Sequence, residues 1–172
     1  MTTFTIRLFG DPVLRQRAAE VAGVDDSVRK LIRDLTDTMP ASGLGLAAPQ
    51  IGITRRVFVW GNGDDTGALA NPRLLESSGE VESDEGCLSL PGLSFPVRRA
   101  QWVRVEGLNE SDQRVVIEAT DLTARIFQHE IDHLDGVLFI DHLPRDLQRE
   151  ARRMLREQML SGMAQTTSPG GL

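Results

Sequence analysis

The sequence is best understood outward from one stretch, Gln128-His129-Glu130-Ile131-Asp132-His133. It contains two of the three histidines in the chain, and a glutamate directly follows the first of them. On a helix, residues four apart lie on one face, so His129 and His133 can bind one metal ion together. Glu130 can then face a water molecule on that ion without binding the ion. So short a motif also occurs by chance. The alternative interpretation is therefore a charged amphipathic helix whose histidines face the solvent and bind no metal.

The overall composition is that of an ordinary globular protein. Hydrophobic residues make up 40% and charged residues 26% of the 172 residues, a length that suits one domain with a sizeable core. We expect that domain to span residues 1–160 and a small, polar, disordered tail to span residues 161–172. The net charge of −6 argues against a general nucleic-acid-binding protein, and we expect no DNA partner.

Several features favour a cytoplasmic protein. No apolar run reaches the roughly 20 residues that cross a bilayer, so we expect no membrane association. Residues 1–7 lack a basic segment followed by an apolar one, which argues against a secretory signal. Cys87 is the only cysteine, so no internal disulfide can form, as is usual in a reducing compartment.

Hydrophobic spacing predicts the secondary structure around the histidines. A helical period predicts a helix over residues 26–39, which Asp25 or Asp26 caps and Pro40 follows. Strands are predicted over residues 4–9, 57–60, 68–75, 95–107 and 113–119, with a loop or edge strand over 76–85 and a hairpin turn at 109–112. Thr120 or Asp121 can cap the histidine helix, which is expected to stop at Gly136. A last helix is expected from Pro144 to about Met159.

The glycine-rich stretch from Gly43 to Gly52 has two interpretations. Its Gly-x-Gly-x-x-Ala pattern matches a dinucleotide-binding fingerprint, and Asp64 and Asp65 lie about twenty residues further on, where that motif requires an acid. However, the fingerprint opens a helix, and Pro49 removes an amide that the helix would need. We therefore favour a loop that brings backbone groups close to a ligand, with Gln50 as a fixed amide at its end.

Cys87 is the candidate for a third metal ligand. A catalytic site with an open position needs at least three protein ligands, and a bound ion lowers the pKa of water toward neutrality. A lone buried cysteine is more often a small core residue. However, Gly86 and Pro91 bracket this one in a tight, non-helical segment that can present a thiolate to an ion. A thiolate favours Fe²⁺, Zn²⁺, Ni²⁺ or Co²⁺ over Mg²⁺ or Ca²⁺.

Three motifs together resemble those of the peptide deformylases. They are Gly43-Leu44-Gly45-Leu46-Ala47-Ala48-Pro49-Gln50, Glu85-Gly86-Cys87-Leu88-Ser89 and the histidine stretch, in that family's order and at similar spacing. The resemblance implies removal of the N-formyl group from the initiator methionine of newly made polypeptides. It also implies an α+β fold in which antiparallel sheets surround a central metal-binding helix, with N-terminal and C-terminal helices. The C-terminal helix resembles that of the bacterial type.

The resemblance and the chemistry of the side chains together suggest roles. Cys87, His129 and His133 would bind the metal ion, and the resemblance favours Fe²⁺. Glu130 would accept a proton and later deliver it, while the Gln50 side chain and the Leu88 backbone N–H would stabilise an oxyanion. The formylmethionyl peptide would be bound by two sets of residues. Gly45 and Gly43 would align its backbone, and Ile126, with Phe127 and residues 92–95, would surround its methionine side chain. Arg99 is a candidate outer partner of Glu85 or of the surroundings of Glu130.

The predicted last helix carries a cluster of arginines interspersed with acidic residues: Arg145, Arg149, Arg152, Arg153 and Arg156. The ordinary interpretation is a solvated helix face. The alternative is contact with the ribosome, because RNA attracts clustered arginines.

Two other functional classes remain open. A metallopeptidase also uses the H-E-x-x-H pattern, although its third ligand usually follows the helix. A non-enzymatic protein with a structural metal would need four ligands, and the remaining histidine, His142, has no evident pairing with the others.

Overall fold

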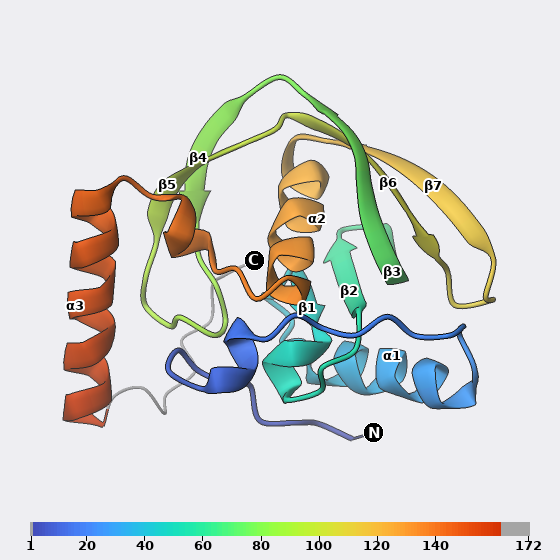
Figure 1. Ribbon diagram of the computed structural model, residues 1–172, viewed down its shortest axis with the longest axis horizontal. Coiled ribbons are helices and arrows are strands. Elements are labelled where there is room, and N and C mark those ends of the chain that lie inside the picture. Colours follow the sequence, from blue (N-terminus) through green and yellow to red (C-terminus); the bar gives the residue numbers. More distant parts are fainter. Residues whose placement is uncertain (1, 163–172) are drawn as a thin grey trace.

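The computed structural model describes residues 2–162, and the predicted α+β class is confirmed. Among these residues, helix α2 (Asp121–Leu134) is central, and a five-stranded sheet curves over it (Figure 1). The helix contacts β1, β2, β6 and β7 of this sheet. No helix in the described part of the chain is long and apolar enough to cross a bilayer.

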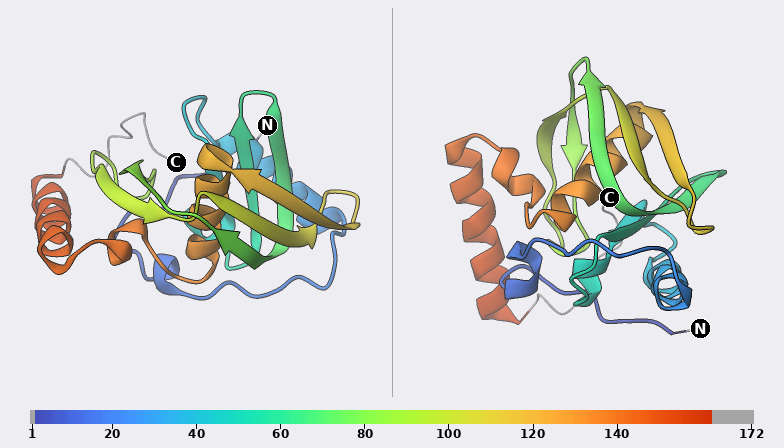
Figure 2. Two further views of the ribbon diagram at one scale, coloured as in Figure 1. Left: turned by 90° about the horizontal axis from the view of Figure 1, so that it is seen from above. Right: turned by 45° about the vertical axis from the view of Figure 1, so that its right-hand side comes forward.

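The large sheet is antiparallel throughout, in the order β1-β2-β3-β6-β7. Its strands are β1 (Gly45–Ala47), β2 (Val57–Asn62), β3 (Asp65–Ser78), β6 (Trp102–Leu108) and β7 (Arg114–Thr120). Two register irregularities interrupt the pairing of β3 with β6, between Ala70 and Arg73 and between Leu74 and Glu76. Such irregularities bend a strand, and β3 arches over α2 with the β6–β7 hairpin beside it (Figure 2).

A smaller sheet pairs β4 (Val81–Glu85) with β5 (Phe95–Arg99). Continuous alternation predicted one strand over residues 95–107, and this prediction is wrong. The strand is interrupted at Ala100 and Gln101. There the Gln128 side chain accepts from Ala100 N–H at 3.0 Å and donates to Ala100 O at 2.9 Å. A side chain of the central helix therefore takes the place of strand pairing at the break.

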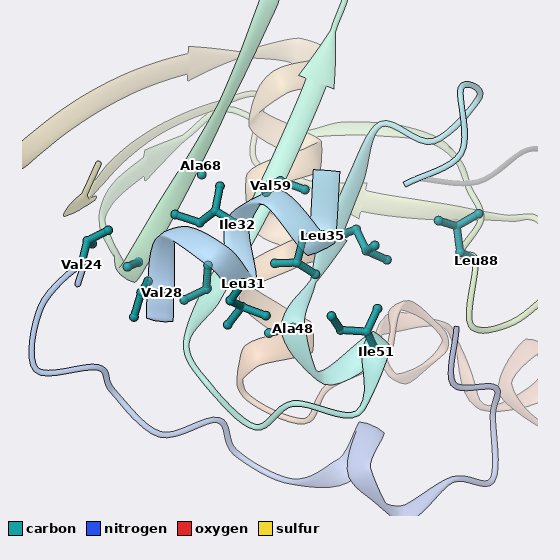
Figure 3. Packing of buried hydrophobic residues seen from close by; sticks show 13 residues of the cluster. Val24, Val28, Leu31, Ile32, Leu35, Ala48, Ile51, Val59, Ala68 and Leu88 are labelled. Carbon is teal, nitrogen blue, oxygen red and sulfur yellow. The ribbon is translucent and has the colours of Figure 1, made fainter. Parts of the chain in front are cut away.

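Helix α1 (Asp26–Thr38) forms as predicted, with the Asp25 carboxylate accepting from Val28 N–H at 2.9 Å. Its apolar face packs on β2 and on the 3₁₀ turn η2 (Ala48–Ile51), and the side chain of Leu88 belongs to the same cluster (Figure 3). Since Leu88 follows Cys87, this packing helps to hold the cysteine segment in place.

The central helix ends close to the predicted position. Its last residue is Leu134, and Gly136 has a φ of +74°. A Cβ at Gly136 would lie 2.6 Å from Arg15 O, so a glycine is required there. At its start, Thr120 is the N-cap, but its side chain makes no capping hydrogen bond.

Helix α3 (Arg145–Ser161) lies at the opposite end of the molecule from β7 (Figure 1). Ala151 and Leu155 are buried in a cluster that also contains Cys87, Leu90 and Leu93. The helix therefore packs against the segment that follows β4. Of the tail predicted to be disordered, residues 163–172 lie outside the described residues.

The prediction of a strand over residues 4–9 is wrong. Arg7 N–H donates to Gln50 O at 2.7 Å, and Phe9 N–H donates to Ser89 O at 2.8 Å. The segment thus makes single hydrogen bonds to two separate loops, which its weak alternation does not reveal. A turn at Gly10 leads into the 3₁₀ turn η1 (Pro12–Arg15).

Candidate metal centre

Three side-chain donors converge where the segment after β4 meets helix α2. Cys87 Sγ lies 3.2 Å from His133 Nε2, which lies 3.2 Å from His129 Nε2. All three residues are buried, and their ligand atoms lie within 4.8 Å of one another. The structure therefore brings together the three ligands predicted from the sequence.

The ring of His129 is oriented by Glu85. His129 Nδ1 lies 2.6 Å from Glu85 Oε1, and because a carboxylate accepts hydrogen bonds, the ring hydrogen lies on Nδ1 and Nε2 keeps its lone pair. Arg99 binds both oxygens of Glu85, which confirms the predicted contact, and Arg125 binds Oε2 at 2.7 Å. Burial alone would raise the pKa of Glu85, but the hydrogen bonds from His129 and Arg99 outweigh it and hold this pKa far below its usual range.

The donor set fits a divalent ion. One sulfur and two imidazole nitrogens are the ligands of a catalytic zinc or iron site that keeps a position open. Without an ion, burial raises the pKa of the Cys87 thiol to about 12 and lowers the pKa of His133 well below its usual value. A positive ion would compensate a thiolate in this buried site, so the residues suit a metal centre better than an empty cluster.

Glu130 is fully buried next to this cluster, with neither carboxylate oxygen hydrogen-bonded to the described residues. Burial, followed by the charges of Glu85 and Asp132, raises its pKa well above the usual value. Gly45 of β1 faces it: a Cβ at Gly45 would lie 2.8 Å from Glu130 Cδ. An unpaired buried carboxyl is costly, so Glu130 is a candidate for a chemical role.

Gln50 has a defined amide orientation. Its Oε1 accepts from Ala47 N–H at 2.8 Å, so Nε2 points toward Ser89 Oγ at 3.2 Å and Cys87 Sγ at 3.7 Å. The amide N–H₂ thus faces the candidate ligands. The N–H of Leu88 donates to no acceptor among the described residues, which leaves it free for a ligand.

The remaining predicted residues surround the site at different depths. Gly43 lies in the turn before β1, where its N–H donates to Pro40 O at 2.8 Å. Ile126 lies one helical turn before Glu130 and is fully buried in the core. Phe127, the other apolar candidate on α2, packs edge-on against Trp60 with ring centroids 4.8 Å apart, which makes it part of the aromatic core.

Sequence reasoning missed three charged or polar residues near the ligands. Arg125 holds Glu85 from behind, Asp132 binds Arg99 at 2.6 Å, and Ser89 contacts Gln50. Arg125 lies four residues before His129, on the same helix face, and that spacing was the available signal.

Comparison with known proteins agrees with this geometry. Residues 3–149 match the family described as polypeptide deformylase. A protein named peptide deformylase from Acidothermus cellulolyticus is 51% identical over 163 residues, covering 94% of this chain and 91% of its own. The chain belongs to the polypeptide deformylase family.

Solved peptide deformylase structures share the fold. The enzyme from Legionella pneumophila has a TM-score of 0.86 and 38% identity, covering 94% of this chain and 98% of its own. The enzyme from Thermus thermophilus has a TM-score of 0.86 and 41% identity, covering 93% and 97%. Deformylases are hydrolases that remove formyl groups from nascent peptides, so the alternative of a non-enzymatic metal protein is set aside.

Proposed function

We propose that this chain removes the N-formyl group from the initiator methionine of newly made polypeptides, with one divalent metal ion as cofactor. The observation that carries the proposal is the convergence of Cys87, His129 and His133 beside the unpaired carboxyl of Glu130, in a member of the deformylase family. We place this activity in one catalytic domain, residues 1–160, in a bacterial cytoplasm.

Cys87, His129 and His133 would hold the ion, and Glu85 would keep the ring of His129 in place. When bound, the ion would supply a Lewis acid that activates water and polarises the formyl carbonyl. We propose Fe²⁺ as the native ion, with Zn²⁺, Ni²⁺ or Co²⁺ able to substitute. Because ferrous iron beside a thiolate is open to oxidation, the iron form should lose activity in air. Full activity after prolonged aerobic storage would contradict the choice of iron.

Groups of the protein transfer the proton and stabilise the developing negative charge. Glu130 accepts a proton from water and delivers one to the departing amine, and its burial keeps this carboxyl free of competing partners. The Nε2–H of Gln50 and the N–H of Leu88 donate to the oxyanion of the formyl group. Losing one such donor typically costs about 3 kcal/mol of transition-state stabilisation.

The peptide is proposed to bind along β1. This strand is at the edge of the large sheet, with β2 as its one partner strand among residues 2–162. An extended peptide can add to such an edge through backbone hydrogen bonds. Gly45 and Gly43 would align the peptide there, and Ile126 would contribute to the apolar surface that receives the methionine side chain.

Hydrolysis of formyl-Met-Ala-Ser by protein purified without oxygen tests the proposal, with bound metal assayed on the same sample. Release of formate should track metal content and should vanish in Glu130→Gln, whereas the acetylated peptide should not be cleaved. A folded, fully metallated sample that releases no formate would show that the site acts on another substrate, and peptidase assays would follow.

A second proposal concerns contact with the ribosome through α3. Its five arginines, Arg145, Arg149, Arg152, Arg153 and Arg156, lie on this helix, and all five are exposed. Clustered arginines attract RNA phosphates. Since Leu155 anchors the helix in the core, reversing charges is a cleaner test than deleting the helix.

The double variant Arg149→Glu with Arg156→Glu should lose co-sedimentation with ribosomes. The control is Arg73→Glu with Arg114→Glu, an equal charge change at two exposed side chains of strands β3 and β7. Equal co-sedimentation of both double variants and the wild type would rule out the contact.

A further inference from the structure

Asp132 connects the charges behind His129 to the protein surface. Its Oδ2 accepts from Arg99 Nη1 at 2.6 Å and lies 2.7 Å from Nε2 of His142. A carboxylate paired with arginine only accepts hydrogen bonds, so the hydrogen of this second contact lies on His142 Nε2. From the sequence, His142 has no evident pairing with the other histidines; the structure pairs it instead with Asp132, the residue before His133.

These contacts complete an unbroken chain. His142 donates to Asp132, which binds Arg99; Arg99 binds Glu85; and Glu85 holds Nδ1 of His129 at 2.6 Å. The chain runs from the 3₁₀ turn η3 (Phe139–His142), where the His142 side chain is 38% exposed, to a candidate metal ligand inside the molecule. Each contact joins a different pair of elements or turns.

The other contacts in this chain of hydrogen bonds depend on the position of Arg99. Its side chain is 4% exposed, and two of its nitrogens bind Glu85, Nε at 3.1 Å and Nη2 at 2.6 Å. Its third nitrogen, Nη1, lies against Asp132 and 3.3 Å from His142. Without Asp132, this buried N–H group would lose its carboxylate, and an unsatisfied charged donor is costly in the interior.

This chain of hydrogen bonds differs from an ordinary surface ion pair. Exposed pairs contribute little, but here Glu85 is fully buried and Asp132 is 21% exposed. Glu85 and Asp132 together balance Arg99 and Arg125, so the removal of one carboxylate changes how the guanidinium groups share the other. A guanidinium that shifts on Glu85 shifts the hydrogen bond that orients the ring of His129.

We propose that Asp132 and His142 are positioning residues for the metal centre. They hold Arg99, and through it Glu85, so that Nε2 of His129 stays directed toward Cys87 and His133. This inference rests on the proposed metal centre. Neither side chain hydrogen-bonds a candidate ligand among the described residues, so their hydrogen bonds reach the ligands through Arg99, Glu85 and the ring of His129.

Titration of the metal-free protein with Co²⁺ under oxygen-free conditions tests the proposal. The visible spectrum of the Co²⁺ form is the second measurement, because it reports the geometry around the ion. Asp132→Asn should weaken Co²⁺ binding about tenfold and change the spectrum, as residues that support metal ligands do when replaced. His142→Ala should weaken binding about threefold, the effect of one lost hydrogen bond. His142→Gln should restore it, because its amide can donate to Asp132.

Asp141→Asn is the matched control. This carboxylate is the neighbour of His142 on η3; it pairs with Arg15 and accepts from Leu138 N–H at 2.9 Å, both outside the chain of contacts. It should leave the Co²⁺ dissociation constant and the spectrum unchanged. Thermal unfolding of each metal-free variant shows whether the fold is kept. If Asp132→Asn does not fold, the two His142 variants test the positioning role, because His142 is exposed.

The outcomes separate this inference from the proposed function. Wild-type affinity and spectrum in both Asp132→Asn and His142→Ala would overturn the positioning role and leave the metal centre standing. Failure of the wild-type protein to bind Co²⁺ would overturn the metal centre itself.

Discussion

Gly45 leaves free the space that the Glu130 side chain occupies. A Cβ at this position would overlap Glu130 Oε1 and lie 3.0 Å from Cγ, so the Gly45→Ala protein must move its glutamate. We expect kcat to fall about tenfold to hundredfold, since small displacements of a catalytic group are costly. Bound metal should stay constant, because the three ligands are untouched.

Gly61→Ala on the neighbouring strand β2 is the control. Its new Cβ would lie 3.6 Å from Met39 and Thr66, an ordinary contact, and activity should be kept. If Gly45→Ala were as active as Gly61→Ala, the placement of Glu130 against β1 would have no catalytic importance.

Glu130 should also make the metal-free protein sensitive to pH. Burial and the charges of Glu85 and Asp132 raise its pKa in the folded protein well above 4.5, so the folded state binds this proton more tightly than the unfolded state. The stabilisation is therefore complete below about pH 4.5 and is lost as the pH rises through the folded pKa. A neutral glutamine avoids the loss.

Metal-free Glu130→Gln should accordingly unfold at a higher temperature than the wild type at neutral pH, and the difference should shrink toward pH 4.5. Thermal unfolding with a chelator present measures this. The exposed Glu110→Gln is the control and should track the wild type at every pH. A difference that does not change with pH would contradict the assignment to Glu130.

At the scale of elements, α3 is predicted to stabilise the segment that carries Cys87. Leu155 is 2% exposed in the cluster that contains Cys87 and Leu90, whereas Leu160 on the same helix is 89% exposed. Leu155→Ala should lower the free energy of unfolding by about 3 kcal/mol. Leu160→Ala should change it by less than about 0.5 kcal/mol. Urea unfolding of the two variants provides the comparison, and equal losses would mean that α3 does not anchor on this cluster.

The elements also show where spacing predicts structure and where it fails. Helices α1 and α3 have strong helical periods and lie within two residues of their predicted bounds. The break between β5 and β6 is different, since residues on both sides alternate. It exists because Gln128, from another element, binds both backbone groups of Ala100, and no local pattern encodes that contact.

At the scale of the whole molecule, the metal ion should stabilise the fold. Its ligands come from the segment after β4 and from α2, so a bound ion would join a surface sheet to the central helix. Free Zn²⁺ at one hundred times its dissociation constant should stabilise the protein by about 2.7 kcal/mol. The unfolding temperature should rise with Zn²⁺ concentration, and the double variant Cys87→Ser with His133→Ala should show no such rise. A wild-type unfolding temperature that does not change with Zn²⁺ concentration would contradict the proposed metal centre.

The sequence by itself determined the properties that depend on near neighbours: the helix that places His129 and His133 on one face, the apolar stripe of α1, and the motifs that carry the family resemblance. Only the tertiary structure decided that the Gln50 amide faces Cys87, that Gly45 makes room for Glu130, and that His142 is linked to His129 through Asp132, Arg99 and Glu85. The physical reason is distance along the chain. Such contacts join residues far apart in sequence, and they form only when the sheet has curved over α2 and burial has removed the water with which these polar groups would otherwise pair.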